Sequence, residues 1–326
     1  MAHVSVPAST ANLGAGFDCI GLAVDRRLDA SATVASHQPG DVTIIRSGTL
    51  SPLDVRPNKD LIYTGFLAAC DAAGRPFTGS VHFNVHSTIP VARGLGSSAA
   101  AVVAGAILAN QTLDLGLTSA RLVDVCAGIE GHADNVAAAL HGGAVLSVVQ
   151  AGTSYKVVHL TVHESLAFVF AVPPFETVTK AARDVLPPVI PHSRAVLAAS
   201  RAASLVLGLA NADADLLAAA LDDVLHVPYR RSLVHGYDDV IASAISAGAY
   251  GATLSGSGST LVAVTPSDAI VEVAEVMQQT WAGLGVTCDT FVSRTPAAGA
   301  GWTVTPPGES NTVTEASALT ERPVAV

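Results

Sequence analysis

The sequence predicts an α+β protein with two domains. Its 326 residues suffice for one large domain or two compact ones. Strand-like segments alternate with helix-like segments, and a short polar stretch at 151–155 separates two such sets. We therefore expect a first domain over residues 1–155 and a second over 156–295. Gly, Pro, Thr and Ser dominate 296–326 without periodicity, which predicts a flexible tail.

In the first half, β-branched residues with a period of two predict strands, and Ala/Leu-rich stretches predict helices. The expected strands are Val4–Val6, parts of Leu22–Val34, Val42–Ile45, Val81–Ser87 and Ala144–Val149. The expected helices are Asp60–Ala73, Ser98–Asn110 and Ser119–Ile129. Gly142 and Gly143 mark the turn before the last of these strands.

The second half follows the same alternation. The expected strands are Leu166–Val172, Thr253–Leu254, Thr260–Thr265 and Thr287–Val292. The expected helices are Arg194–Leu209, Ala214–Leu221, Asp238–Ala247 and Ala269–Leu284. A second glycine loop, Ser255–Ser259, lies between two of the strands.

Composition and charge narrow the classes of function. Half of the residues are apolar and 13% are charged, and the net charge is −10, which argues against nucleic acid or acidic lipid as the main partner. The longest apolar run, Ala99–Ala109, is too short to span a bilayer, and no secretory signal is visible. The four cysteines form no zinc-ligand pattern. We expect a soluble cytoplasmic protein.

The run Ile89–Ala101 combines a strand end at Pro90, a turn at Gly94 and Gly96, and a helix that begins at two serines. Such a helix N-terminus leaves backbone N–H groups unpaired and favours anions. A turn with serine N-caps is the alternative interpretation. A Walker A loop would need a lysine here, and a dinucleotide fingerprint would need a third glycine. With three lysines in the chain, backbone N–H groups and arginines must supply any field for a polyanion.

Pro90-x-x-x-Gly-Leu-Gly-Ser-Ser-Ala-Ala resembles the phosphate loop of the GHMP small-molecule kinases. Further segments agree in order with the homoserine kinases of that family, from about residue 3 to residue 295. These segments are Pro7–Asp18, Glu130–Asn135, Thr179–Arg183 with its following Asp-Val-Leu-Pro, Pro228–Arg230 and Leu254–Ser259.

The resemblance implies the two-domain GHMP kinase fold, with a ribosomal-S5-like N-terminal domain and a ferredoxin-like C-terminal domain. It implies ATP-dependent phosphorylation of the side-chain hydroxyl of L-homoserine, a step of threonine biosynthesis, with ATP and Mg²⁺ as cofactors and a homodimer as the usual assembly. Two alternatives stay open: a kinase for a related hydroxy or amino acid or another small alcohol, and a non-catalytic sensor of small molecules. Departures from the homoserine kinase pattern keep the first alternative open, at Ala133, Ala138, His235, Ser257 and Ser259.

The resemblance also implies site residues. Those for the ATP phosphates are Pro90, Arg93, Gly94, Leu95, Gly96, Ser97, Ser98, Ala99, Ala100, Gly256 and Gly258. Those for the substrate are Asn12, Asp18, His132, Asn135, Thr179, Arg183 and Arg230. The chemistry suits a zwitterion with one hydroxyl, because arginine forks match a carboxylate and Asp18 matches an ammonium group. Arg231 is the open alternative to its neighbour Arg230.

For the metal, the family spacing implies Ser98 with Asp124, eleven residues before Asn135, and Glu130 is the rival ligand. Asn135, Asn12 and Arg183 are the implied catalytic residues. An amide cannot accept a proton at neutral pH, so we expect catalysis by positioning and charge stabilisation without a general base. The adenine pocket is expected near Asn58, Asp60 and Leu61.

Overall fold

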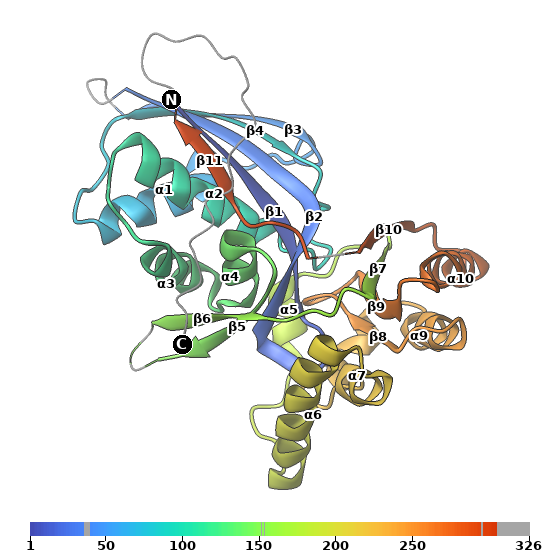
Figure 1. Ribbon diagram of the computed structural model, residues 1–326. Helices are drawn as coiled ribbons and strands as arrows, with labels where there is room; N and C mark the ends of the chain where they lie inside the picture. The colour runs from blue at the N-terminus through green and yellow to red at the C-terminus, as the bar shows by residue number, and fades with distance from the viewer. Residues whose placement is uncertain (36–39, 151, 153, 295, 305–326) are drawn as a thin grey trace.

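The computed structural model describes residues 1–35, 40–150, 152, 154–294 and 296–304. Two sheets with their helices make up the molecule (Figure 1). The larger sheet has seven strands in the order β11-β1-β2-β4-β3, and β5 and β6 extend from β2. Its strands are β1 (Ala2–Asn12), β2 (Gly16–Ala35), β3 (Val42–Gly48), β4 (Ser80–Ser87), β5 (Ala144–Val149), β6 (Tyr155–Leu160) and β11 (Gly301–Val304).

The long strand β2 organises this sheet. It pairs with all of β1, with β4 along its second half, and with β5 at Ile20–Leu22. The sequence predicted only parts of this strand, because its burial pattern does not alternate cleanly between inside and outside. The register with β1 shifts after Pro7 and again before Asn12, where β1 ends.

The helices of the first domain pack on this sheet, and α2 lies at their centre (Figure 1). They are α1 (Leu61–Ala72), α2 (Ser97–Thr112), α3 (Ser119–Glu130) and α4 (Asp134–His141), with the 3₁₀ turn η1 (Pro57–Lys59). The small residues of α2 are buried on nearly every side, as expected for a helix that is apolar all round. Helices α1, α2 and α3 were predicted, whereas α4 was not.

The second sheet is antiparallel, in the order β10-β7-β9-β8. Its strands are β7 (Leu166–Val172), β8 (Gly251–Leu254), β9 (Leu261–Pro266) and β10 (Asp289–Ser293). Its helices are α5 (Thr179–Asp184), α6 (His192–Asn211), α7 (Ala214–Leu221), α8 (Val227–Arg230), α9 (Tyr237–Ser246) and α10 (Ile270–Gly283), with the 3₁₀ turn η2 (Arg231–Leu233). Numbered within the domain, the strand order is 4-1-3-2 with helices after the first and third strands, which confirms the ferredoxin-like arrangement.

The expected domain limits need two corrections. The boundary at residue 155 cuts the β5–β6 hairpin, whose second strand belongs to the first sheet. The expected tail also begins too early, because β11 pairs with the start of β1 and Trp302 packs against the core. Glycine-rich composition around this short strand hid its Trp-Thr-Val sequence. Residues 305–326 of the expected tail lie outside the described residues.

By length and composition alone, one helix in the described part of the chain could cross a membrane, namely α6. Leu205 and Leu209 are buried on its inner side, and α6 packs against α7. Arg201 donates from Nη2 to Asp222 Oδ2 at 2.7 Å beyond the end of α7. We interpret α6 as a helix of the C-terminal domain.

The crossing of α1 and α2 depends on glycine. A Cβ added at Gly105 would lie 1.8 Å from the carbonyl oxygen of Ile62, so alanine does not fit without separating the helices. We expect Gly105→Ala to lower the free energy of unfolding by about 3 kcal/mol in urea titrations. A Cβ at Gly128, which is exposed in the last turn of α3, would meet nothing within 4 Å, so Gly128→Ala should raise the free energy of unfolding by about 0.5–1 kcal/mol. If Gly105→Ala and Gly128→Ala change the free energy of unfolding equally, α1 and α2 do not cross as closely as described.

Candidate active site

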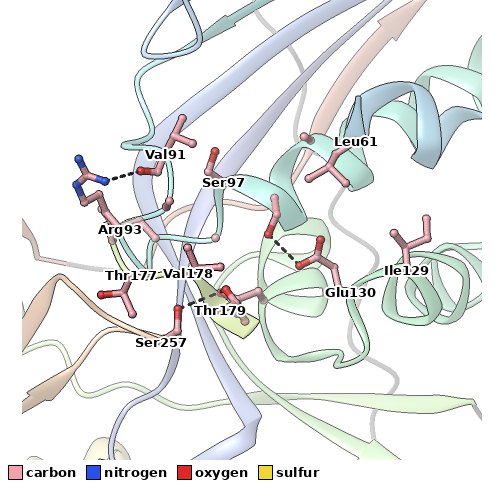
Figure 2. A pocket seen from close by; sticks show the side chains of 18 of the residues that line it. Leu61, Val91, Arg93, Ser97, Ile129, Glu130, Thr177, Val178, Thr179 and Ser257 are labelled. Atoms are coloured by element: carbon pink, nitrogen blue, oxygen red, sulfur yellow. Dashed lines mark hydrogen bonds between the residues drawn. The ribbon is translucent and has the colours of Figure 1, made fainter. Parts of the chain in front are cut away.

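A cavity of about 580 Å³ lies between the two domains, and its walls come from both (Figure 2). Its volume suits a small-molecule site. Fourteen of the residues expected at the phosphates and the substrate line it: Asn12, Asp18, Arg93, Gly94, Leu95, Gly96, Ser97, Ser98, His132, Asn135, Thr179, Arg183, Arg230 and Gly256. Pro90, Ala99, Ala100, Gly258 and Asp124 do not belong to the lining.

The first turn of α2 forms one wall of the cavity. Gly96, with a left-handed φ of 66°, is its N-cap, and the first bond across the cap runs from the N–H of Ala100 to the carbonyl of Gly96. The earlier N–H groups of the helix therefore have no partner within it. A Cβ at Gly96 would lie 2.1 Å from Ser9 Oγ, so only glycine fits against β1. This geometry favours an anion at the helix start.

The second glycine loop supports the first. The N–H of Gly256 donates to Ala11 O at 3.0 Å, and Asn12 Nδ2 donates to Gly256 O at 2.8 Å. Ser255 Oγ donates to Gly94 O at 2.7 Å, and a Cβ at Gly94 would lie 2.1 Å from the carbonyl oxygen of Ser255. Gly258 packs behind this contact and does not line the cavity.

Arg93 lines the cavity, and its guanidinium donors face groups of the protein. Its Nη1 donates to Val91 O at 3.0 Å (Figure 2). Its Nε donates to Pro173 O at 3.1 Å, and Nη1 lies 3.3 Å from Glu176 Oε1. The guanidinium is thus used to hold the phosphate loop to the segment after β7.

Asp18 and Arg183 form a bidentate ion pair, with N–O distances of 3.0 and 2.9 Å. The hydrogen bonds that Arg183 donates to Asp18 outweigh burial and raise the pKa of Arg183. The N–H of Asp18 donates to Asn12 Oδ1 at 2.9 Å. Asn12 and Asp18 both have left-handed backbone angles, with φ of 74° and 56°, which these two residue types tolerate better than most. The carboxylate of Asp18, at the start of β2, and the guanidinium of Arg183 are thus held together in the cavity.

Arg230 is buried beside this pair, with 2% of its surface exposed. Its Nε donates to Ala182 O at 2.8 Å, and its Nη1 lies 3.4 Å from His226 Nδ1. Burial, followed by the charge of Arg183, lowers the pKa of Arg230 to about 10. Arg231 instead pairs with Asp238 at 3.1 Å and does not line the cavity, so Arg230 is the one of the two arginines that reaches it.

Asp134, 1% exposed, orients Asn135 and His132. Its Oδ1 accepts from His132 Nδ1 at 2.6 Å and from the N–H and Nδ2 of Asn135 at 2.7 and 3.3 Å. Ser9 Oγ donates to Asn135 Oδ1 at 2.9 Å. Burial alone would lower the pKa of His132, but the hydrogen bond and charge of Asp134 outweigh it and raise that pKa. The motif contained Asp134, but only the fold shows it and Ser9 acting on Asn135.

The expected metal pair is not formed, and Glu130 takes the place of Asp124. Ser98 Oγ donates to Glu130 Oε2 at 2.9 Å inside the cavity (Figure 2). Asp124 Oδ1 instead accepts from the N–H of Tyr155 at 2.9 Å. Asp124 is six residues before Glu130 on α3, so the two side chains point about 120° apart around the helix. Sequence spacing to Asn135 did not take this direction into account.

Glu130 fits a cation. Burial raises the pKa of its carboxyl group, the bond from Ser98 and the charge of His132 offset this in part, and the charge of Asp134 adds to it. A cation bound at Ser98 and Glu130 would favour the ionised carboxylate. Across the described ranges, no group of three or more His, Cys, Asp or Glu side chains forms a metal cluster.

An apolar lobe extends the cavity toward η1 and α1. Its walls include Leu50, Leu53, Val55, Leu61 and Ile129. Of the residues expected near adenine, Leu61 and Asp60 line the lobe and Asn58 does not. Asp60 Oδ1 accepts from the N–H of Ile62 at 2.9 Å as the N-cap of α1, and Oδ2 accepts from Arg46 Nε at 3.0 Å. Both carboxylate oxygens of Asp60 therefore bind groups of the protein, and the lobe offers a ligand mainly apolar surface.

Comparison with known proteins agrees with this geometry. Models of the GHMP kinase N-terminal and C-terminal domains match residues 60–143 and 205–283. The chain is 39% identical to a homoserine kinase of Picosynechococcus, over 87% of this chain and 93% of that protein, and 38% identical to one of Gloeobacter violaceus, over 87% and 94%.

Solved structures extend the comparison. The homoserine kinase of Cytophaga hutchinsonii superposes with a TM-score of 0.82 at 31% identity, covering 92% of this chain and 96% of that one. The mevalonate kinase of L. major, solved with R-mevalonate, has a TM-score of 0.67 at 16% identity and covers 90% and 96%. The second likeness concerns the fold alone.

The buried His226 should make stability depend on pH. Burial is the main cause that lowers its pKa from the ordinary 6.5 to about 4. Between these values the unfolded chain binds the proton and the folded chain does not, so stability is lost as the pH falls. We expect the free energy of unfolding to decrease by up to about 1.4 kcal/mol per pH unit from this group. Urea titrations should show a flatter dependence in His226→Asn and an unchanged one in His163→Asn, a matched exposed control. Equal slopes in all three proteins would contradict a neutral buried His226.

Proposed function

The chain belongs to the GHMP kinase family, and we propose that it transfers the γ-phosphate of ATP to the side-chain hydroxyl of L-homoserine, giving O-phospho-L-homoserine. One observation carries the proposal of this acceptor. Asp18, Arg183 and Arg230 bring one acidic and two basic side chains to the cavity that also contains the start of α2. That set of charges fits an amino acid next to a phosphate donor.

The ammonium and carboxylate groups of the substrate are complementary in charge to the part of the cavity formed by Asp18, Arg183 and Arg230, which we call the amino-acid corner. Asp18 offers the ammonium group a carboxylate, and Arg183 offers the substrate carboxylate two parallel donors. Because the Asp18–Arg183 pair is about one third exposed on each side, a zwitterion can replace it by two equivalent pairs at little cost. Mevalonate and galactose carry no ammonium group and would leave Asp18 without compensation.

The donor lies along the loop Gly94–Ser98. Phosphate oxygens accept from the N–H groups at the start of α2, and the adenine occupies the apolar lobe. Ser98 and Glu130 are the residues that would hold Mg²⁺, which supplies charge neutralisation of the phosphates when bound. In a chain with a net charge of −10, these local groups supply the field that attracts ATP.

The reaction proceeds without a general base. Asn135 cannot accept a proton, and its amide is oriented by Asp134 and Ser9. Asp134 already accepts from His132, whose raised pKa favours its protonated form. We therefore assign positioning of the hydroxyl to Asn135 and Asn12, and charge stabilisation to Arg183. The hydroxyl proton leaves late, to the transferred phosphate.

The acceptor is tested by ADP release over homoserine, threonine, serine, mevalonate and galactose. We expect kcat/KM for homoserine to exceed that for each other compound by at least about 100-fold. Mevalonate and galactose lack the ammonium group, and serine and threonine carry the hydroxyl one carbon closer to it. If another compound is phosphorylated rapidly and homoserine is not, homoserine is not the acceptor, although the chain is still a kinase of this family. Binding of ATP without ADP release from any compound would instead support a sensor.

The metal ligand is tested by Glu130→Gln. This change removes the carboxylate charge beside Ser98 and should raise the Mg²⁺ concentration for half-maximal activity at least about tenfold. Asp124→Asn is the matched control on the same helix and should leave that concentration unchanged. If Asp124→Asn raises that Mg²⁺ concentration and Glu130→Gln does not, Asp124 and not Glu130 is the metal ligand beside Ser98.

A further inference from the structure

We propose that His226 is a positioning residue for the carboxylate of the substrate: it fixes Arg230 of the C-terminal domain against the start of β2, which carries Phe17 and Asp18. The inference rests on the proposed function, because it adds a residue to the same site. His226 is fully buried and does not line the cavity, so it acts through other residues.

The two ring nitrogens of His226 face groups of opposite kind. Nε2 lies 3.1 Å from the carbonyl oxygen of Gly14, which can only accept, so Nε2 carries the proton. Nδ1 lies 3.4 Å from Arg230 Nη1, which can only donate. The neutral tautomer with its proton on Nε2 satisfies both contacts. A second proton on Nδ1 would face the guanidinium and lose that contact.

Phe17 joins the same arrangement from the other domain. Its ring stacks on His226 with centroids 4.8 Å apart and an angle of 19°. The guanidinium carbon of Arg230 lies 5.1 Å from the centroid of the same Phe17 ring. Such a contact attracts the cation to the ring face. Because Phe17 precedes Asp18 in sequence, the position of Arg230 is tied to that of the acidic residue.

The backbone on both sides of this contact is fixed. Asp223, itself buried, accepts from the N–H groups of Leu225, His226 and Val227 at 2.6–3.0 Å. The N–H of Ala15 donates to the carbonyl of Ala220 at the end of α7 at 3.0 Å. A Cβ on Gly14 would lie 2.5 Å from that same carbonyl oxygen. The loop of the N-terminal domain therefore lies directly on the C-terminal domain.

The charge of the partner explains why a histidine suits this position. The charged groups that act on the ring are Asp223, Arg230 and Asp18, and burial keeps the ring neutral. A carboxylate here would neutralise Arg230 and compete with the carboxylate of the substrate. A neutral imidazole accepts from Arg230 and leaves its positive charge available to the cavity.

The test compares His226→Phe with His226→Asn in steady-state kinetics. Phenylalanine keeps a ring on Phe17 but removes both hydrogen bonds, whereas the Oδ1 of asparagine can accept where Nδ1 does. We expect His226→Phe to raise the KM for homoserine roughly 10–100-fold, with kcat and the KM for ATP within about twofold of wild type. His226→Asn should recover at least half of the loss on a logarithmic scale. His163→Asn, an exposed histidine change, is the control and should alter nothing.

A second acceptor separates positioning from a general packing effect. 2-Amino-1,4-butanediol, the alcohol counterpart of homoserine, lacks the carboxylate, so its KM should be high in wild type and no higher in His226→Phe. An equal rise for both acceptors, or an equal rise in the KM for ATP, would overturn the proposal. Phe17→Leu, which keeps His226 and removes the aromatic face, should give the same selective rise for homoserine. It provides the same test if His226→Phe does not fold.

The outcomes also separate this inference from the proposed function. If wild type does not phosphorylate homoserine, the proposed function fails. If wild type does so and the KM for homoserine is unchanged in both His226→Phe and Phe17→Leu, the positioning role alone fails.

Discussion

The rest of the site depends on one physical constraint, the unpaired N–H groups at the start of α2 held against an anion-binding cavity. Lysines are few, so the backbone must supply much of the positive potential. That requires a helix that cannot move, which explains the burial of α2 on nearly every side. It also requires glycine at positions 94 and 96, where β1 and the second glycine loop approach within contact of the turn. The core of the first domain and the phosphate loop are thus parts of one arrangement.

Around that helix start, the charged side chains are compensated by one another. Asp18 pairs with Arg183, His132 with Asp134, and Ser98 donates to Glu130. These groups differ in how easily they can exchange partners. The Asp18–Arg183 pair is 35–37% exposed and therefore adds little stability, so a ligand with both charges can divide it. Asp134 is buried, and its Oδ1 accepts from both His132 and Asn135, so it serves to orient these neighbours.

The sequence was sufficient for the glycine turn at Gly94 and Gly96 with its following helix, for most helices and strands around it, and for the ferredoxin-like second domain, because these depend on local periodicity and glycine placement. The sequence was not sufficient where the direction of a side chain or a contact between distant segments determines the outcome. Spacing favoured Asp124, yet the helix turns it away from Ser98 and brings Glu130 there. Arginine at position 93 suggested a phosphate ligand, yet three backbone carbonyls use its donors. A four-residue strand from a distant part of the chain, β11, carries too little pattern to be distinguished from a tail.

The amino-acid corner is divided between the domains, and this division bears on specificity. Asp18 comes from the start of β2, whereas Arg183 and Arg230 come from α5 and α8. Neither domain alone contains both signs of charge at this corner, so recognition of a zwitterion depends on how accurately the two domains meet. Phe17, Gly14 and His226 lie at that meeting point and out of the cavity. Substitutions there can change which acceptor binds while leaving the phosphate loop unaltered, because α2 and its glycines depend on different contacts. Related kinases can therefore differ in acceptor through residues that never touch it.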